Sequence, residues 1–209
     1  MYIPPAFKVD DVESIRAIIR DARLANLVTA TAEGPVATPM PLFLDDTEGE
    51  HGTLYGHLAK ANPQWHLPLI GEALAIFTGP EAYVTPSWYA TKQETGKVVP
   101  TWNYVAVHAY GPVEFFQETE RLLDVVTRLT NKHEGSRAKS WAVSDAPADF
   151  IAAQLRGIVG VRIPVVRFES KRKMSQNRPE ADRVGVAAGL AASDCPQDRQ
   201  VAPLISVPV

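Results

Sequence analysis

A long series of strand-like segments joined by short turns most constrains how this chain can fold. Between residues 27 and 116, apolar and β-branched residues alternate with polar ones, and Gly, Pro and acidic residues separate the segments. The pattern predicts strands over residues 27–31, 36–44, 54–58, 73–79, 81–85 and 100–116, the last with a break at Gly111-Pro112. Because helices do not alternate with these strands, antiparallel pairing is favoured over βαβ units. The predicted fold class is mainly β with helices (α+β), built on a small antiparallel β-barrel.

Helical periodicity lies on either side of this series. It predicts helices over residues 10–25, 117–132, 147–156 and from Pro179 to about 191, with one further strand over residues 158–170. No internal repeat or linker interrupts the chain. We therefore expect a single domain over residues 1–192. Residues 193–209 are rich in Pro, Gln and Asp, and they read as a C-terminal tail.

Composition excludes several classes of protein. The 209 residues carry a formal charge of -3, which disfavours a surface that binds nucleic acid everywhere. No apolar run approaches the roughly 20 residues of a membrane span, and the N-terminus lacks the pattern of a signal peptide. We expect a cytoplasmic protein that does not contact membranes. One cysteine, Cys195, rules out an internal disulfide framework.

Common catalytic and cofactor motifs are missing from the sequence. There is no Gly-x-Gly-x-x-Gly after a strand, no Walker lysine motif and no Gly-x-Ser-x-Gly elbow. The five histidines lack metal-ligand spacing, so no metal site is expected. Catalytic residues stay unknown at this level.

Residues 55–65 are the most suggestive segment. A strand with alternating Leu54 and Leu58 ends there, and Lys60 and Asn62 follow directly before Pro63. An ammonium group, an amide and backbone N–H groups at a strand end suit a phosphate, which needs several hydrogen bonds. The alternative is an ordinary surface lysine in a hairpin corner.

Three further polar and aromatic segments accompany it: residues 85–89, 99–104 and 171–178. Each has an ordinary explanation, because indoles such as Trp102 are also typical of cores and interfaces. Together with residues 55–65 they supply flat apolar surfaces, amides and cations. A planar heteroaromatic ring with a phosphate tail requires these groups.

These segments carry a resemblance to a known family. The chain resembles the PaiB-like FMN-binding negative transcriptional regulators, which belong to the FMN-binding split-barrel superfamily. The matching segments run in order from residue 1 to about 190: Met-Tyr-Ile-Pro-Pro at 1–5, Gly-His-Leu-Ala-Lys-Ala-Asn-Pro-Gln-Trp at 56–65, Tyr-Val-Thr-Pro-Ser-Trp-Tyr at 83–89, Val-Pro-Thr-Trp-Asn-Tyr at 99–104 and Lys-Met-Ser-Gln-Asn-Arg at 173–178.

The resemblance implies a split β-barrel of the FMN-binding type, a homodimer, and FMN near the subunit interface. Lys60 looks like the cation that holds the FMN phosphate, and Trp102 and Asn103 look placed to reach the ring from the partner subunit. The implied cofactor-binding residues are His57, Leu58, Ala59, Lys60, Asn62, Gln64, Trp102, Asn103, Lys173, Gln176, Asn177 and Arg178.

Three functions remain open on this scaffold. The first is a PaiB-type negative transcriptional regulator, whose contact with DNA has only the basic residues 171–173 and two nearby arginines to support it. The second is a flavin-dependent oxidoreductase of the pyridoxamine-phosphate-oxidase-like class, acting on a small molecule. The third is a dimer that binds a non-flavin ligand or handles haem, with a histidine as axial ligand. Whether the protein is an enzyme is undecided, and the resemblance favours the regulator.

Overall fold

The computed structural model describes residues 1–207, which form two compact units. Unit 1 comprises Met1–Ile18, Thr78–Val107 and the chain from Glu169 onward. Unit 2 comprises Ile19–Phe77 and His108–Phe168. Each unit is thus assembled from segments far apart in the sequence. The assignment of residues 1–192 to a single domain stays a prediction.

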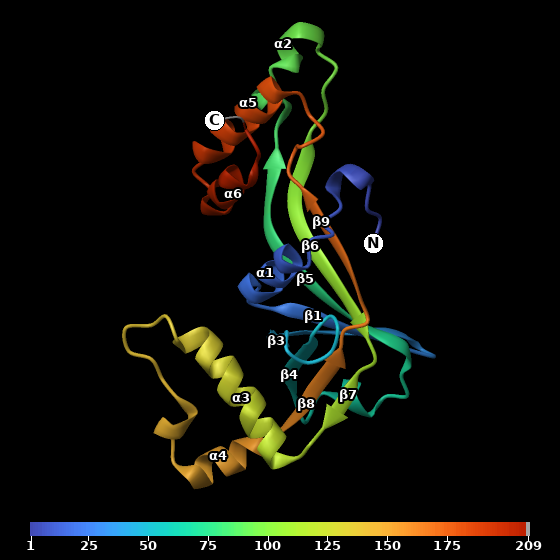
Figure 1. Ribbon diagram of the computed structural model, residues 1–209, viewed down its shortest axis with the longest axis vertical. Helices are drawn as coiled ribbons and strands as arrows, with labels where there is room; N and C mark the ends of the chain where they lie inside the picture. The colour runs from blue at the N-terminus through green and yellow to red at the C-terminus, as the bar shows by residue number, and fades with distance from the viewer. Residues whose placement is uncertain (208–209) are drawn as a thin grey trace. The chain divides into compact units, whose positions relative to one another are not determined.

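Within residues 1–207, nine strands form two sheets. The five-stranded sheet has the order β2-β1-β5-β6-β9, and the four-stranded sheet has the order β3-β4-β8-β7 (Figure 1). The first contains β1 (Ala25–Thr31), β2 (Gly34–Met40), β5 (Ile70–Val84), β6 (Thr101–Gly111) and β9 (Arg167–Lys173). The second contains β3 (Leu42–Asp45), β4 (Thr53–Ala59), β7 (Glu114–Phe116) and β8 (Ile158–Pro164). Antiparallel neighbours such as β1–β2 and β4–β8 confirm the predicted α+β class.

The β1–β2 hairpin follows from its sequence. The turn ends at Gly34, whose φ of 125° is accessible to glycine but not to most residues. The register then pairs Thr31 with Gly34 and Ala25 with Met40. On β1, Ala25 and Leu27 are buried while Asn26 is exposed, as the alternation predicts.

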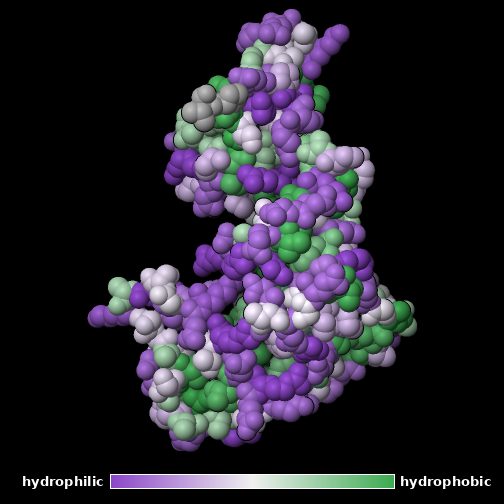
Figure 2. All heavy atoms as spheres, in the orientation of Figure 1, coloured by the Kyte–Doolittle hydropathy of each residue, from purple (hydrophilic) through white to green (hydrophobic). Residues whose placement is uncertain are grey.

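One face of the four-stranded sheet carries a cross-strand row of side chains. The antiparallel registers pair Phe43 with Tyr55, Tyr55 with Arg162 and Arg162 with Glu114. Helix α3 (Thr119–Glu134) lies along this face, and α4 (Ala148–Leu155) packs against α3 (Figure 1). The core between helices and sheet contains Phe43, Phe116, Leu122, Val125, Leu129 and Leu155. Figure 2 shows apolar atoms at the surface over α4, and Phe150 there is exposed.

Unit 1 has its own core. Helices α1 (Val12–Asp21) and α2 (Thr91–Thr95) precede and interrupt the strand segments, and α5 (Glu180–Ala191) and α6 (Pro196–Val201) follow them. The core is made of side chains from strands and C-terminal helices alike: Ala82, Val84, Tyr89, Val105, Met174, Val186, Leu190, Val201 and Ile205. Within residues 193–209, predicted as a tail, α6 therefore supplies a buried side chain, that of Val201.

Several boundaries differ from those predicted. Helix α1 ends at Asp21 rather than near residue 25, and the segment 36–44 divides into β2 and β3 at Pro41. Residues 73–79 and 81–84 belong to one strand, β5, and Thr85 caps the short helix that follows. The segment 158–170, predicted as one strand, is two strands in different sheets. After Pro164, the backbone N–H of Val165 bonds to the carbonyl of Gly52, so the β8 ladder ends there.

Among residues 1–207, no helix combines the length and the apolar character needed to cross a membrane.

Candidate functional site

The turn after β4 holds Lys60 by its backbone. The Lys60 N–H donates to the Gly157 carbonyl at 2.8 Å, and the Lys60 carbonyl accepts from Trp65 Nε1 at 3.0 Å. The Asn62 N–H donates to the Ala59 carbonyl at 2.9 Å. These contacts differ from the expectation of free backbone N–H groups, because the N–H groups of Lys60 and Asn62 are already used.

The Lys60 ammonium group is available to a ligand. The residue is exposed, and within residues 1–207 its side chain has neither an ion-pair partner nor a hydrogen-bond partner. A cation in a fixed turn with no internal partner is suited to an external anion.

Gln64 and Asn62, in contrast, are engaged inside unit 2. Asn62 caps the short helix η2 (Pro63–His66), because its Oδ1 accepts from the Gln64 N–H at 2.9 Å. Its Nδ2 donates to Thr38 Oγ1 at 3.0 Å. The Gln64 side chain is fully buried, and its Nε2 donates to Thr29 Oγ1 at 3.0 Å. These contacts favour a structural role for Gln64 over direct contact with a cofactor.

His57 and Leu58 point to opposite faces of β4. Leu58 is 3% exposed, whereas His57 lies on the Tyr55 side of the strand, one row from Arg162. The two side chains therefore lie on opposite faces of the sheet, and their contact with a cofactor stays a prediction. His57 Nδ1 is buried and has no hydrogen-bond partner among residues 1–207. Burial lowers the pKa of His57 below its ordinary value, since the charged imidazolium loses hydration.

The other predicted residues lie in unit 1. Lys173 Nζ donates to the Trp102 carbonyl at 2.6 Å and also bonds to Thr101 Oγ1. Burial lowers the pKa of Lys173, and the positive charges of Lys171 and Arg178 lower it further. No carboxylate contributes to this shift of the Lys173 pKa. The three nearby cations Lys171, Lys173 and Arg178 therefore create a positive local potential.

A tight turn fixes the remaining residues of this group. Asn103 is fully buried, and its Nδ2 donates to Ser175 Oγ at 3.0 Å. Ser175 has a φ of 59°, a left-handed conformation that is rare for serine. Gln176 Oε1 accepts from the Met174 N–H at 2.6 Å, so Gln176 also stabilises the turn. Asn177 is exposed.

Two further predicted residues of unit 1, Arg178 and Trp102, lie beside or present aromatic rings. The Arg178 guanidinium lies 4.8 Å from the ring centroid of Tyr89. Trp102 is 53% exposed, so its indole is available to a ligand or partner.

Sequence reasoning missed the environment of Lys171. This lysine is 7% exposed, and its Nζ donates to the Tyr2 carbonyl at 3.3 Å. The rings of Tyr2, Phe7 and Tyr104 lie 5.7, 6.0 and 5.1 Å from Nζ. The faces of aromatic rings attract a cation and offset part of its lost hydration. Only the basic run at 171–173 hinted at this site, because the aromatic residues come from distant parts of the chain.

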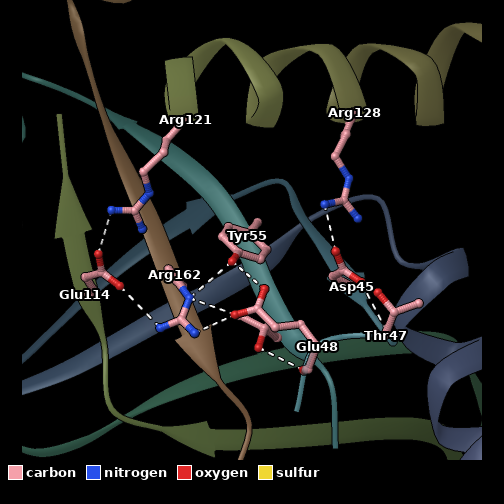
Figure 3. A network of polar contacts seen from close by, with 9 residues as sticks. Asp45, Thr47, Glu48, Tyr55, Glu114, Arg121, Arg128 and Arg162 are labelled. Atoms are coloured by element: carbon pink, nitrogen blue, oxygen red, sulfur yellow. Dashed lines mark hydrogen bonds and ion pairs between the residues drawn. The ribbon is translucent and has the colours of Figure 1, made fainter. Parts of the chain in front are cut away.

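A polar network, also unforeseen, lies under α3 in unit 2 (Figure 3). Arg162 donates to Glu48, Glu114 and the hydroxyl of Tyr55, and the Tyr55 hydroxyl donates to Glu48 Oε2 at 2.6 Å. The hydrogen bond from Tyr55 lowers the pKa of Glu48, and Arg162 lowers it further. Above the network is a cavity of about 450 Å³ lined by Glu48, Tyr55, Phe116, Glu120, Arg121, Asp124, Val125 and Arg128.

Comparison with known proteins identifies the family. A family model described as "Putative FMN-binding domain" matches residues 1–167. The chain belongs to this FMN-binding family. FMN is the cofactor of the family, which confirms the cofactor predicted from the sequence.

Two relatives cover most of the chain. "Protease synthase and sporulation protein PAI 2" of Bacillus subtilis is 34% identical over 206 residues, which are 98% of this chain and 96% of that protein. An uncharacterised protein of Emericella nidulans is 34% identical over 227 residues, covering 91% of this chain and 90% of that protein. The predicted resemblance to PaiB-like proteins is thus confirmed.

Solved structures of the same fold are more distant. The FAD and heme binding protein of Mycobacterium smegmatis is 13% identical, with a TM-score of 0.57 over 79% of this chain and 73% of that one. The flavocytochrome Anf3 of Azotobacter vinelandii is 13% identical, with a TM-score of 0.55 over 79% and 69%. At this identity the likeness concerns the fold, and it confirms the split-barrel class.

The residues present fit FMN. The cofactor combines an anionic phosphate, a hydroxylated chain and a planar apolar ring. Within residues 1–207, Lys60 supplies a cation with no side-chain partner, and His57 supplies a buried polar nitrogen without a hydrogen bond. Trp102 supplies an exposed aromatic face.

Proposed function

We propose that this member of the FMN-binding family is a homodimeric, PaiB-type regulator that holds the FMN phosphate with Lys60. The observation that carries the proposal is the Lys60 ammonium group, which is exposed and has no partner in the described part of the chain. It lies on a turn fixed by three hydrogen bonds to or from its backbone. An ammonium group at a strand end can donate to phosphate oxygens without breaking any contact of the fold.

In this proposal, residues of β4 and the turn after it bind the phosphate, and residues of unit 1 bind the rest of the flavin. Lys60 neutralises the phosphate at the end of β4. In the proposed homodimer, Trp102, Lys173 and Arg178 provide an aromatic face and positive charge to the flavin that is bound by Lys60 of the partner subunit. When bound, FMN supplies reversible one- and two-electron redox chemistry. Three other side chains stabilise the local structure around the site through internal hydrogen bonds: those of Gln64, Asn103 and Gln176.

The homodimer is supported by exposed aromatic surface on unit 1. Tyr83 is 45% exposed and Trp102 is 53% exposed, and their rings meet edge to face with centroids 5.9 Å apart. Val99, also in unit 1, is 65% exposed. Exposed aromatic side chains are enriched at subunit interfaces, because they bury a large area at a low cost in entropy.

The regulatory role is supported by a relative that matches nearly the whole chain. The Bacillus subtilis protein is named for protease synthesis and sporulation, and its alignment includes 98% of this chain. Transfer of that role to this chain is our proposal.

Replacing Lys60 with alanine is expected to weaken FMN binding about tenfold, since one charge-assisted hydrogen bond to phosphate is lost. Riboflavin, which lacks the phosphate, is expected to bind with unchanged affinity. Flavin fluorescence titration measures both constants. Lys139→Ala, an exposed lysine elsewhere in unit 2, is the matched control and should change neither. Equal FMN affinities of Lys60→Ala and the unchanged protein would remove Lys60 from the phosphate site.

One experiment tests the homodimeric regulator. The FMN-loaded protein should sediment as a dimer, and it should enrich specific fragments from a pool of its own genomic DNA at moderate salt. A monomeric particle contradicts the dimer. Bleaching of the flavin by NAD(P)H without any enriched fragment would favour the oxidoreductase over the regulator.

A further inference from the structure

The buried side-chain amide of Gln64, a residue of η2, forms hydrogen bonds to both β1 and β2 of unit 2. Its Nε2 donates to Thr29 Oγ1 at 3.0 Å on β1, and at 3.3 Å to the carbonyls of Leu27 on β1 and Val36 on β2. Its Oε1 accepts from Thr38 Oγ1 of β2 at 2.6 Å. The side chain is completely inaccessible to solvent, so these bonds are not replaced by bonds to water.

Thr38 has only one proton to donate, and this fixes the direction of the network. Its hydroxyl donates to Gln64 Oε1, and its oxygen accepts from Asn62 Nδ2 at 3.0 Å. Asn62 in turn caps η2 by accepting from the Gln64 N–H. The result is a closed ring of hydrogen bonds, Asn62 to Thr38 to Gln64 and back to Asn62.

This ring anchors the turn that carries Lys60. Asn62 lies two residues after Lys60, and its N–H closes the turn onto Ala59. Because Thr38 belongs to a sheet strand, the ring ties the turn to a rigid element rather than to a loop. A binding group that is ordered in advance loses less entropy when its ligand arrives.

We propose that Thr38 and Gln64 are positioning residues that set the preference of this site for phosphorylated over unphosphorylated flavin. The inference rests on the proposed role of Lys60. Neither side chain contacts the ligand. Thr38 orients Asn62, Asn62 and Gln64 hold the turn, and the turn presents the Lys60 ammonium group to the phosphate.

A purely structural role predicts a different outcome from a positioning role. If the ring served only stability, its loss would weaken FMN and riboflavin binding equally. If it positions Lys60, its loss affects only the ligand that bears the phosphate. The ratio of the FMN and riboflavin dissociation constants separates the two roles.

Thr38→Val removes the hydroxyl and keeps the shape of the side chain. We expect FMN to bind about fivefold more weakly, the size expected for loss of one hydrogen bond, with riboflavin affinity unchanged. Thr38→Ser restores the hydroxyl and should restore FMN affinity. In the double variant Lys60→Ala/Thr38→Val, FMN should bind no more weakly than in Lys60→Ala alone, because the two changes act on one interaction.

Thr31→Val is the matched control. Thr31 also donates a hydroxyl hydrogen bond, to the Gly34 carbonyl at 2.9 Å, but at the hairpin end of β1. It should leave the FMN to riboflavin ratio unchanged. If Thr38→Val does not fold, Asn62→Ser keeps a capping oxygen while removing the donor to Thr38, and the same loss of FMN preference is expected.

Titration of the 209-residue protein with FMN and riboflavin distinguishes failure of the Lys60 assignment from failure of the positioning role. If Lys60→Ala leaves the ratio unchanged, the proposed phosphate role of Lys60 is wrong. In the other case, Lys60→Ala lowers the preference for FMN, but Thr38→Val weakens the binding of FMN and riboflavin equally or changes neither. The positioning role of Thr38 and Gln64 is then overturned, while the assignment of Lys60 stands.

Discussion

Replacing Gly185 with alanine is expected to destabilise unit 1 by more than about 3 kcal/mol, although glycine to alanine within a helix ordinarily stabilises by about 1 kcal/mol. Gly185 lies inside α5, where a Cβ atom would stand 2.0 Å from the carbonyl oxygen of Trp88. A backbone oxygen of η3 (Pro86–Trp88) cannot rotate away as a side chain can. Helix α5 must therefore separate from η3, and contacts of the buried Val186 and Leu190 are lost with it.

Urea unfolding followed by tryptophan fluorescence measures the effect. Ala188, exposed on the same helix, gives the control: Ala188→Gly should cost only about 1 kcal/mol, from helix propensity alone. Gly189→Ala should also destabilise, because its Cβ would meet the Trp88 ring at 2.3 Å. A Gly185→Ala protein as stable as the unchanged one would show that α5 does not pack on η3 in this way.

Local patterns predicted much of the sheet structure. The predicted strand at the start of residues 100–116 is present as β6, where Asn103, Val105 and Val107 are buried and Trp102 is exposed. Ala106 departs from strict alternation, because it is also buried although it shares a face with Trp102. The break at Gly111-Pro112 was also confirmed, because β6 ends at Gly111 and β7 begins at Glu114. Such patterns are local, and a strand shows its buried face in its own sequence.

Contacts between distant segments could not be predicted in this way. The role of Gln64 depends on Leu27, Thr29, Val36 and Thr38, which lie 26 to 37 residues away in the sequence. As a polar residue after a turn, Gln64 reads as exposed, yet it is fully buried. Residues 196–201 show no strong apolar period, and α6 is stabilised by packing on α5 rather than by its own sequence.

The candidate site was predicted as a set of residues rather than as an arrangement. The resemblance named twelve side chains, and the structure shows different local roles for them. Lys60 and Trp102 are exposed to a ligand, whereas Gln64 and Asn103 are buried with internal partners. A motif match cannot distinguish a residue that contacts a cofactor from one that holds the contacting residue in place.

Replacing Arg162 with methionine is expected to destabilise unit 2 by about 2 kcal/mol. The change leaves Glu48 and Glu114 without their shared cation and removes a donor to Tyr55 (Figure 3). Breaking a fully buried pair costs about 3–5 kcal/mol. Here the side chains of Arg162, Glu48 and Glu114 are 28%, 38% and 43% exposed, so solvent screening reduces the loss. Arg137→Met, which breaks a surface pair with Glu134, should change stability by less than about 0.5 kcal/mol.

The dependence on pH distinguishes loss of charge pairing from loss of packing. The pKa of Glu48 is lowered by the Tyr55 hydrogen bond and by Arg162, and that of Glu114 by Arg121 and Arg162. A carboxyl group with a lowered folded-state pKa stabilises the fold above its ordinary pKa of 4.5, and this contribution disappears as pH falls through the folded value. The free energies of unfolding of Arg162→Met and the unchanged protein should therefore differ most near pH 7 and converge as pH falls below 4.5 through the lowered folded-state pKa values of the two carboxyl groups. A difference that stayed constant over this range would assign the effect of Arg162 to its packing beneath α3.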